Sequence, residues 1–165
     1  MTTKQTKQTK ESTPARHVIL IDIETFVPSS ALSQHDVEMV SGLLREHIPG
    51  YDHDQQIVAC SHHTARVAAF AFPRARQLWK SGRDGPASAL LEVLETEGLS
   101  ERYQRVTICS GNRILAGAVA ALAADGIDVT VLSFADRLAA RLQLAARHVC
   151  LLHAEGPMDS AAGAA

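Results

Sequence analysis

The sequence predicts an α/β domain in which helices cover both faces of a mainly parallel sheet of five or six strands. Short runs of β-branched and aliphatic residues recur along the chain, separated by segments whose apolar residues fall at helical spacing. Continuous apolar runs are typical of strands that are buried on both faces, as they are in parallel sheets. The repeat of strand and helix, about 20 to 25 residues long, favours a parallel sheet flanked by helices.

The folded region is expected to lie between two tails. Residues 1–16 contain almost no apolar side chain, so burial could not offset the entropy cost of ordering them. We predict a disordered basic tail there, one domain over residues 17–153, and a flexible tail rich in Ala and Gly over residues 154–165. The domain is long enough to enclose one core and too short for two.

The first predicted strand covers residues 18–21, Val-Ile-Leu-Ile. Ser33 or Asp36 can cap the helix that follows, and apolar residues repeat at helical spacing from there to Ile48. Pro49-Gly50 ends that helix.

The next two strands are predicted at residues 57–60 and, with a weaker pattern, at residues 77–79. A short helix over residues 64–72 separates them. It stops before Pro73, because proline has no N–H to donate within a helix.

Asp84 is placed to cap the following helix, which has Pro86 in its first turn and a stripe of leucines beyond it. The remaining strands are predicted at residues 106–109 and 129–132, with a sixth candidate at 149–152, and the remaining helices at 114–124 and 135–147. These segments complete the alternation of strands with helices.

Composition argues against several classes of function. Charged residues make up 21% of the chain and the net charge is −2, which disfavours attachment to nucleic acid by the whole surface. Aromatic residues make up only 4%, so base-stacking platforms are not expected. No apolar run approaches the roughly 20 residues that span a bilayer, and we expect a cytoplasmic protein that does not bind membranes. The three cysteines share no metal-binding spacing and are expected to be buried free thiols.

Small, acidic or amide side chains follow, or nearly follow, predicted strands in three stretches, at residues 21–25, 82–86 and 109–113. Because the carboxyl ends of parallel strands lie at one edge of a sheet, we expect a ligand crevice there. Asp22 and Glu24 point the same way if the strand continues that far, which suits a shared hard cation such as Mg²⁺. The alternative is a strand-terminal aspartate that only caps a turn.

The turn Ser110-Gly111 opens the helix predicted after the fourth strand, and its backbone N–H groups are suited to binding a phosphate or a carboxylate. Asn112 can also be the N-cap of that helix, and the two roles are compatible. Lys80, Arg83 and Arg113 flank the same crevice. They are expected either to bind phosphate oxygens or to form a solvated rim without a ligand.

Four segments of the chain resemble the NYN domains of the PIN-like nuclease superfamily, most closely the bacterial ones. They are Ile-Asp-Ile-Glu-Thr at residues 21–25, Gly-Arg-Asp-Gly at 82–85 with the helix after it, residues 105–112, and residues 126–131. The resemblance covers about residues 17–153 and implies a Rossmann-like, three-layer α/β/α fold.

In that family, acidic residues at the carboxyl edge of the sheet bind Mg²⁺ or Mn²⁺ and activate water to cut RNA. The resemblance therefore implies that Asp22, Glu24 and Asp84 are metal-binding and catalytic residues, and that Asn112 positions metal-bound water or substrate. It also implies RNA as the partner.

The chain departs from the family at acidic positions. The family places Asp after the Ser-Gly of the fourth strand, often with a second acid two residues later; here these positions are Asn112 and Ile114. Ala87 stands where the middle stretch of the family typically has a further acid. Each neutral replacement weakens both cation binding and the activation of bound water, so the metal and its catalysis are expected to be weakened or lost.

Two functions follow from these observations. One is a weakened metal-dependent endoribonuclease, and the other is a noncatalytic module that binds RNA, a nucleotide or a protein through the same crevice. Residues 22–25 also resemble the first motif of DEDD exonucleases, but antiparallel strands follow that motif and a helix is predicted here. A receiver domain is disfavoured because no Lys follows the fifth strand. The Ala-rich helices would let two copies approach closely, so a homodimer is also an expectation.

Overall fold

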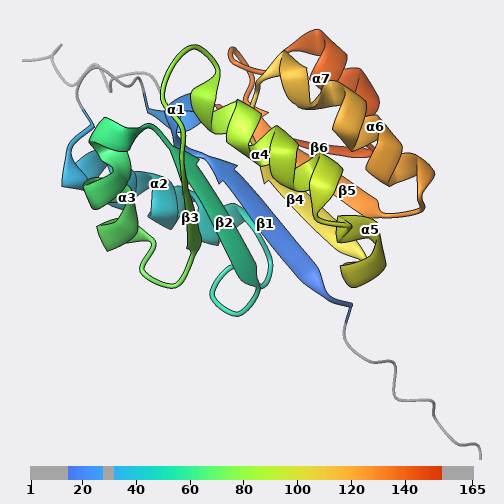
Figure 1. Cartoon of the computed structure of the whole chain (residues 1–165), viewed down its shortest axis with the longest axis horizontal. Coiled ribbons are helices and arrows are strands. Elements are labelled where there is room, and N and C mark those ends of the chain that lie inside the picture. Colours follow the sequence, from blue (N-terminus) through green and yellow to red (C-terminus); the bar gives the residue numbers. More distant parts are fainter. Residues whose placement is uncertain (1–14, 28–31, 154–165) are drawn as a thin grey trace, which may run out of the picture.

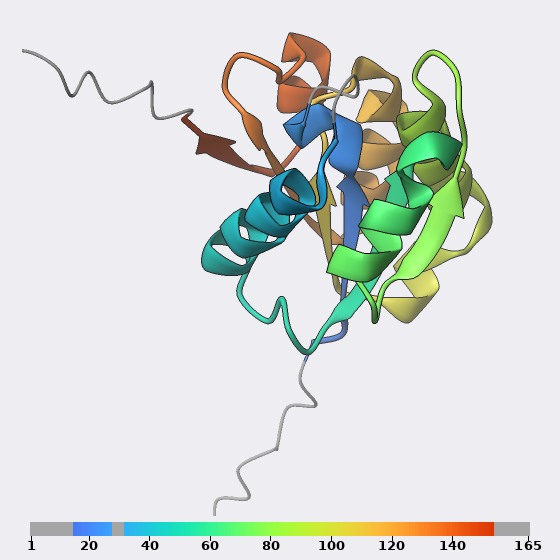
Figure 2. The same ribbon diagram turned by 90° about the vertical axis from the view of Figure 1, so that its left-hand side faces the viewer.

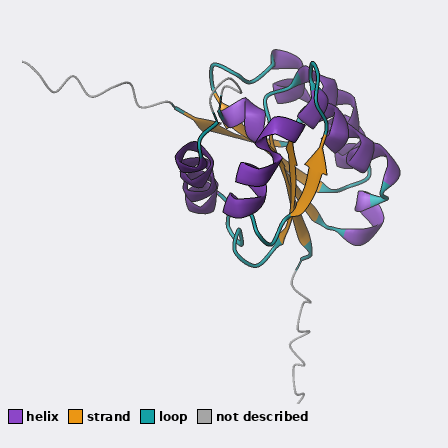
Figure 3. Ribbon diagram, turned by 60° about the vertical axis from the view of Figure 1, so that its left-hand side comes forward, coloured by secondary structure: helices purple, strands orange, loops and turns teal. Residues whose placement is uncertain are grey.

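The computed structural model of the chain describes residues 15–27 and 32–153, which form a six-stranded parallel sheet between two layers of helices (Figures 1 and 3). The tails predicted at residues 1–16 and 154–165 lie outside this part of the chain, apart from residues 15 and 16. The strands are β1 (His17–Asp22), β2 (Gln55–Cys60), β3 (Arg76–Trp79), β4 (Arg105–Cys109), β5 (Asp128–Phe134) and β6 (His148–Leu152). The α/β class and the sixth strand are thereby confirmed.

The strands lie in the order β3-β2-β1-β4-β5-β6, and every neighbouring pair is parallel. In this Rossmann-like order the direction of strand addition reverses between β1 and β4. Ligands of open α/β sheets bind beyond the carboxyl ends of the strands at such a reversal. The topology therefore directs attention to the ends of β1 and β4.

Helices cover both faces of the sheet (Figure 2). They are α1 (Ile23–Phe26), α2 (Gln34–His47), α3 (Ala65–Ala71), α4 (Gly85–Thr96), α5 (Leu99–Arg102), α6 (Ala116–Ala124) and α7 (Ala140–Ala145), with single 3₁₀ turns η2 (His62–Thr64) and η3 (Arg113–Leu115). One core lies under α2 and α3, and the other under α4, α6 and α7. Among the described residues, no helix has the length and apolar character needed to cross a bilayer.

Both residues proposed as caps of α2 contribute to its start. Ser33 is the N-cap; its hydroxyl accepts a hydrogen bond from the Asp36 N–H, and the Asp36 carboxylate accepts one from the Ser33 N–H at 2.9 Å. This reciprocal arrangement is a capping box, which satisfies backbone donors that have no partner within the helix.

The central strand β1 is anchored in both cores. Val18 and Leu20 pack on the α4 side and Ile19 and Ile21 on the α2 side, and all four are fully buried. Burying each such side chain contributes roughly 1.5–3 kcal/mol to folding. The end of β1, where Asp22 lies, is therefore held rigidly.

The last predicted helix is shorter in the structure. Residues 135–139 form a turn after β5, and α7 begins only at Ala140. The Ala139 N–H donates a hydrogen bond to the Gly111 carbonyl at 3.0 Å, which draws this turn onto the loop that follows β4. A hydrogen bond between residues that are far apart in the sequence thus outweighs the local helical pattern in deciding where α7 begins.

Candidate functional site

Asp22 ends β1 and is buried, with 4% of its surface exposed. Its Oδ2 accepts hydrogen bonds from the hydroxyls of Thr25 at 2.9 Å and Ser110 at 3.0 Å. Its Oδ1 is also buried and has no partner among the described residues. Burial raises the pKa of Asp22; the two hydroxyls oppose this shift and the charge of Glu24 adds to it. A proton or a cation at Oδ1 would stabilise this carboxylate.

Glu24 does not point the same way as Asp22. β1 ends at Asp22 and α1 begins at Ile23, so the extended geometry that would align the two carboxylates is not reached. Glu24 Oε1 instead accepts a hydrogen bond at 3.2 Å from the N–H of Ser61, just beyond β2. Asp22 is therefore bonded toward β4, through Ser110, and Glu24 is bonded toward β2, through Ser61.

Asp84 and Asn112 are in direct contact. The Asn112 amide Nδ2 donates to Asp84 Oδ1 at 2.7 Å, and its Oδ1 accepts from the Ile114 N–H at 3.1 Å. Asn112 is thus the N-cap of η3, as one interpretation of the sequence held. Asp84 holds the N-cap position of α4 in a left-handed conformation, but its side chain makes no capping hydrogen bond. The expected cap at Asp84 is absent because its carboxylate binds Asn112.

The turn Ser110-Gly111 joins these groups. Ser110 is fully buried, and its hydroxyl donates to Asp22 and accepts from the Asn112 N–H at 3.2 Å. Its side chain therefore positions Asp22 and is not open to a ligand, so a direct side-chain contact to phosphate is not available. Gly111 lines the crevice, and a Cβ atom there would lie 2.2 Å from the Arg137 carbonyl oxygen.

Arg137 is a site residue that the sequence analysis missed. Its Nη1 donates to the Thr25 carbonyl at 2.6 Å, and its guanidinium lies 5.3 Å from the centre of the Phe134 ring. With Glu24, Thr25, Gly111 and Asn112 it lines an open crevice of about 470 Å³. The sequence predicts a helix over residues 135–147, and the sequence signal for the close approach of residue 137 is the glycine at position 111.

The three predicted basic residues differ in their surroundings. Lys80 forms an ion pair with Glu92 of α4. Arg83 and Arg113 are exposed and form no ion pair within the described ranges. Because they adjoin Asp84 and Asn112, whose side chains are in contact, both arginines lie at the same part of the edge.

A divalent metal does not fit the donors as arranged. Mg²⁺ requires near-octahedral oxygen ligands, supplied in part by carboxylates. One oxygen of Glu24 and one of Asp84 accept hydrogen bonds from N–H groups, and Oδ1 of Asp22 is buried without a partner among the described residues. Across the described ranges, no group of three His, Cys, Asp or Glu residues is placed to hold a metal ion. The acidic pocket expected from Asp22, Glu24 and Asp84 is therefore incomplete.

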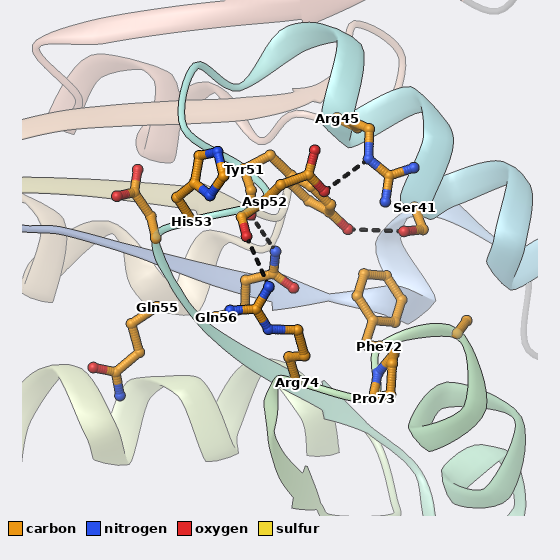
Figure 4. A pocket seen from close by; sticks show the side chains of 12 residues that line it. Ser41, Arg45, Tyr51, Asp52, His53, Gln55, Gln56, Phe72, Pro73 and Arg74 are labelled. Atoms are coloured by element: carbon orange, nitrogen blue, oxygen red, sulfur yellow. Dashed lines mark hydrogen bonds and ion pairs between the residues drawn. The ribbon is translucent and has the colours of Figure 1, made fainter.

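A second cavity, of about 340 Å³, lies at the opposite end of the sheet near the start of β2 (Figure 4). Its polar groups are largely paired with one another. Arg45 Nε donates to Asp52 at 2.9 Å, and the hydroxyls of Ser41 and Tyr51 are 3.0 Å apart. Burial raises the pKa of Tyr51 to about 12, so its hydroxyl stays neutral. These contacts stabilise the loop between α2 and β2.

The fold and the position of the crevice define a Rossmann-like α/β/α domain whose candidate site lies at the reversal of strand order. No family model matches the chain, and no curated protein matches it significantly. Its structure is similar to the crystal structure of a protein of unknown function from Vibrio parahaemolyticus, with a TM-score of 0.54 and 13% sequence identity. The match covers 84% of this chain and 93% of the other. At this identity the likeness shows a shared fold.

Proposed function

We propose that this chain is a PIN-like domain of the NYN type that binds RNA through its phosphates and has lost a complete metal-dependent catalytic set. The observation that carries the proposal is the hydrogen bond from Asn112 to Asp84 at 2.7 Å, beside Arg137 in the same crevice. The amide of Asn112 and the guanidinium of Arg137 supply hydrogen-bond donors in place of negative charge. Such donors favour the binding of an anion over the binding of a cation.

The charge around the crevice supports the same function. Arg137, Arg83 and Arg113 bring three guanidinium groups to the edge where β1 and β4 end. Guanidinium groups pair with phosphate oxygens in bidentate fashion and are suited to nucleic-acid backbones. Arg137 is the best placed of the three, because its contacts with Thr25 and Phe134 orient it before a ligand arrives.

Replacing Arg137 with alanine is expected to weaken binding of single-stranded RNA by about tenfold, the loss expected for a charge-assisted hydrogen bond. The slope of log affinity against log salt concentration is expected to fall by about 1, because one fewer phosphate is neutralised. Fluorescence anisotropy of a labelled oligonucleotide measures both quantities. Arg141→Ala is the matched control, since Arg141 is an exposed arginine on α7 outside the crevice. Equal losses in the two variants would exclude the crevice as the binding site.

A metal-dependent endoribonuclease is the second candidate, and the buried, unpartnered Oδ1 of Asp22 is the observation that favours it. The two functions are separated by incubating the protein and its Asp22→Asn variant with labelled single-stranded RNA and Mn²⁺. We expect both proteins to bind the RNA and neither to shorten it. RNA cleavage that requires Mn²⁺ and is lost in the variant would replace the binding function with the enzymatic one.

A further inference from the structure

Trp79, the single tryptophan of the chain, is 54% exposed at the end of β3. We propose that it is a stacking platform for a base of single-stranded RNA whose phosphates occupy the crevice, an inference that rests on the proposed function. Composition alone argued against such platforms, because aromatic residues are few. One exposed indole ring at the correct edge is nevertheless sufficient for one base.

Trp79 lies at the same edge of the sheet as the crevice. It pairs in register with Cys60, the last residue of β2, and the next residue, Ser61, donates its N–H to Glu24 in the crevice. β3 is two strands from β1, which corresponds to about 10 Å. A nucleic-acid strand that follows the carboxyl edge from Arg137 thus passes toward Trp79.

The surroundings of Trp79 suit an uncharged base better than a phosphate. Trp79 lines a cavity of about 390 Å³ between β3 and α4, together with residues that form two ion pairs. Lys80 is paired with Glu92, and Arg76 with Glu97 at 2.7 Å, so the charges of the lining are balanced. Arg113 and Arg137, which form no ion pair within residues 15–27 and 32–153, lie instead beside the ends of β4 and β1. An RNA strand along this edge would therefore place its phosphates beside the arginines and a base beside Trp79.

A second copy of the chain is a less suitable partner for Trp79. β3 is an edge strand of only four residues, and short edge strands with flanking lysines are features that limit pairing with another strand. Antiparallel pairing of two copies centred on Leu78 would place Arg76 opposite the partner's Lys80. Like charges opposite each other destabilise such a pair.

Intrinsic fluorescence tests the proposal directly, because all tryptophan emission comes from Trp79. We expect a single-stranded RNA oligonucleotide to quench this emission. Inorganic polyphosphate, which carries phosphate charge and no base, should compete for binding without quenching. Trp79→Ala is expected to lower RNA affinity by about 5- to 150-fold, the range for loss of one stacked base. Trp79→Phe should restore part of the affinity.

Phe70→Ala is the matched control, since Phe70 is an aromatic residue on α3 with 64% exposure that does not line this cavity. Its RNA affinity should equal that of the unmodified protein. If RNA binds without quenching and Trp79→Ala keeps full affinity, the stacking role is wrong while the proposed function stands. If no RNA binds to the unmodified protein, both fail. Emission that changes with protein concentration in the absence of RNA would assign Trp79 to self-association and overturn the proposal.

Discussion

Replacing Gly111 with alanine is expected to destabilise the folded protein by about 3 kcal/mol, the upper part of the range for overpacking a closely packed site. The added Cβ would lie 2.2 Å from the Arg137 carbonyl oxygen and 2.9 Å from Ser133 Oγ. The nearer atom belongs to the backbone and cannot rotate away. Chemical denaturation of the variant measures the change in the free energy of unfolding.

Gly117→Ala is the control for this substitution. A Cβ at Gly117 meets nothing within 4 Å, and the residue lies inside α6. Alanine should stabilise that helix by about 1 kcal/mol because it restricts the unfolded chain and favours helix. The two substitutions are chemically identical and should have opposite signs. A Gly111→Ala protein as stable as the unmodified one would show that the loop after β5 does not rest on the loop after β4.

Asp22→Asn is expected to stabilise the protein at pH 7 by roughly 1 to 3 kcal/mol, because it removes a buried charge whose Oδ1 has no partner among the described residues. Burial raises the pKa of Asp22 in the folded state above its value in the unfolded chain. The contribution of the protonated carboxyl to stability is therefore fully present at low pH and is lost as the pH rises through the folded-state pKa. Asparagine is neutral at every pH, so the stability difference between the two proteins should shrink on acidification.

The measurement compares unfolding free energies of both proteins at pH 7 and in steps toward pH 4. Buried His17 also titrates, with a pKa lowered mainly by burial, but it affects both proteins alike and cancels in the difference. Asp36→Asn provides a control of opposite sign, because hydrogen bonds to Ser33 lower the pKa of Asp36. The ionised Asp36 carboxylate contributes stability above its unfolded-state pKa, and this contribution is lost as the pH falls through its folded-state pKa. A difference for Asp22→Asn that does not change with pH would contradict the raised pKa.

The sheet is the part of the fold that could be predicted from the sequence, because strands covered on both faces need uninterrupted apolar runs. Residues 18–21 and 106–109 show this plainly, and both form central strands. The helix predicted over residues 135–147 was too long, since local periodicity does not register the hydrogen bond from Ala139 to the Gly111 carbonyl. Contacts between loops distant in the sequence decide where such a helix begins.

Some residues of the candidate site could likewise be predicted from the sequence, and others could not. Asp22 ends β1 and Asn112 lies in the turn that follows β4, and the structure brings them to one edge through Ser110. The direction of Glu24 could not be predicted, because it depends on where β1 gives way to α1. Arg137 and Trp79 carry no local signal; only the assembled sheet places a guanidinium over the crevice and leaves an indole ring exposed.

The order of the strands divides the site between the two halves of the chain. Asp22, Glu24 and Asp84 come from the half that builds β1 to β3, and Asn112 and Arg137 from the half that builds β4 to β6. The crevice therefore lies between these two halves of the sheet, and it forms only when β1 pairs with β4. A ligand that binds there contacts both halves, so it binds only the folded protein. Its binding shifts the folding equilibrium toward the folded state.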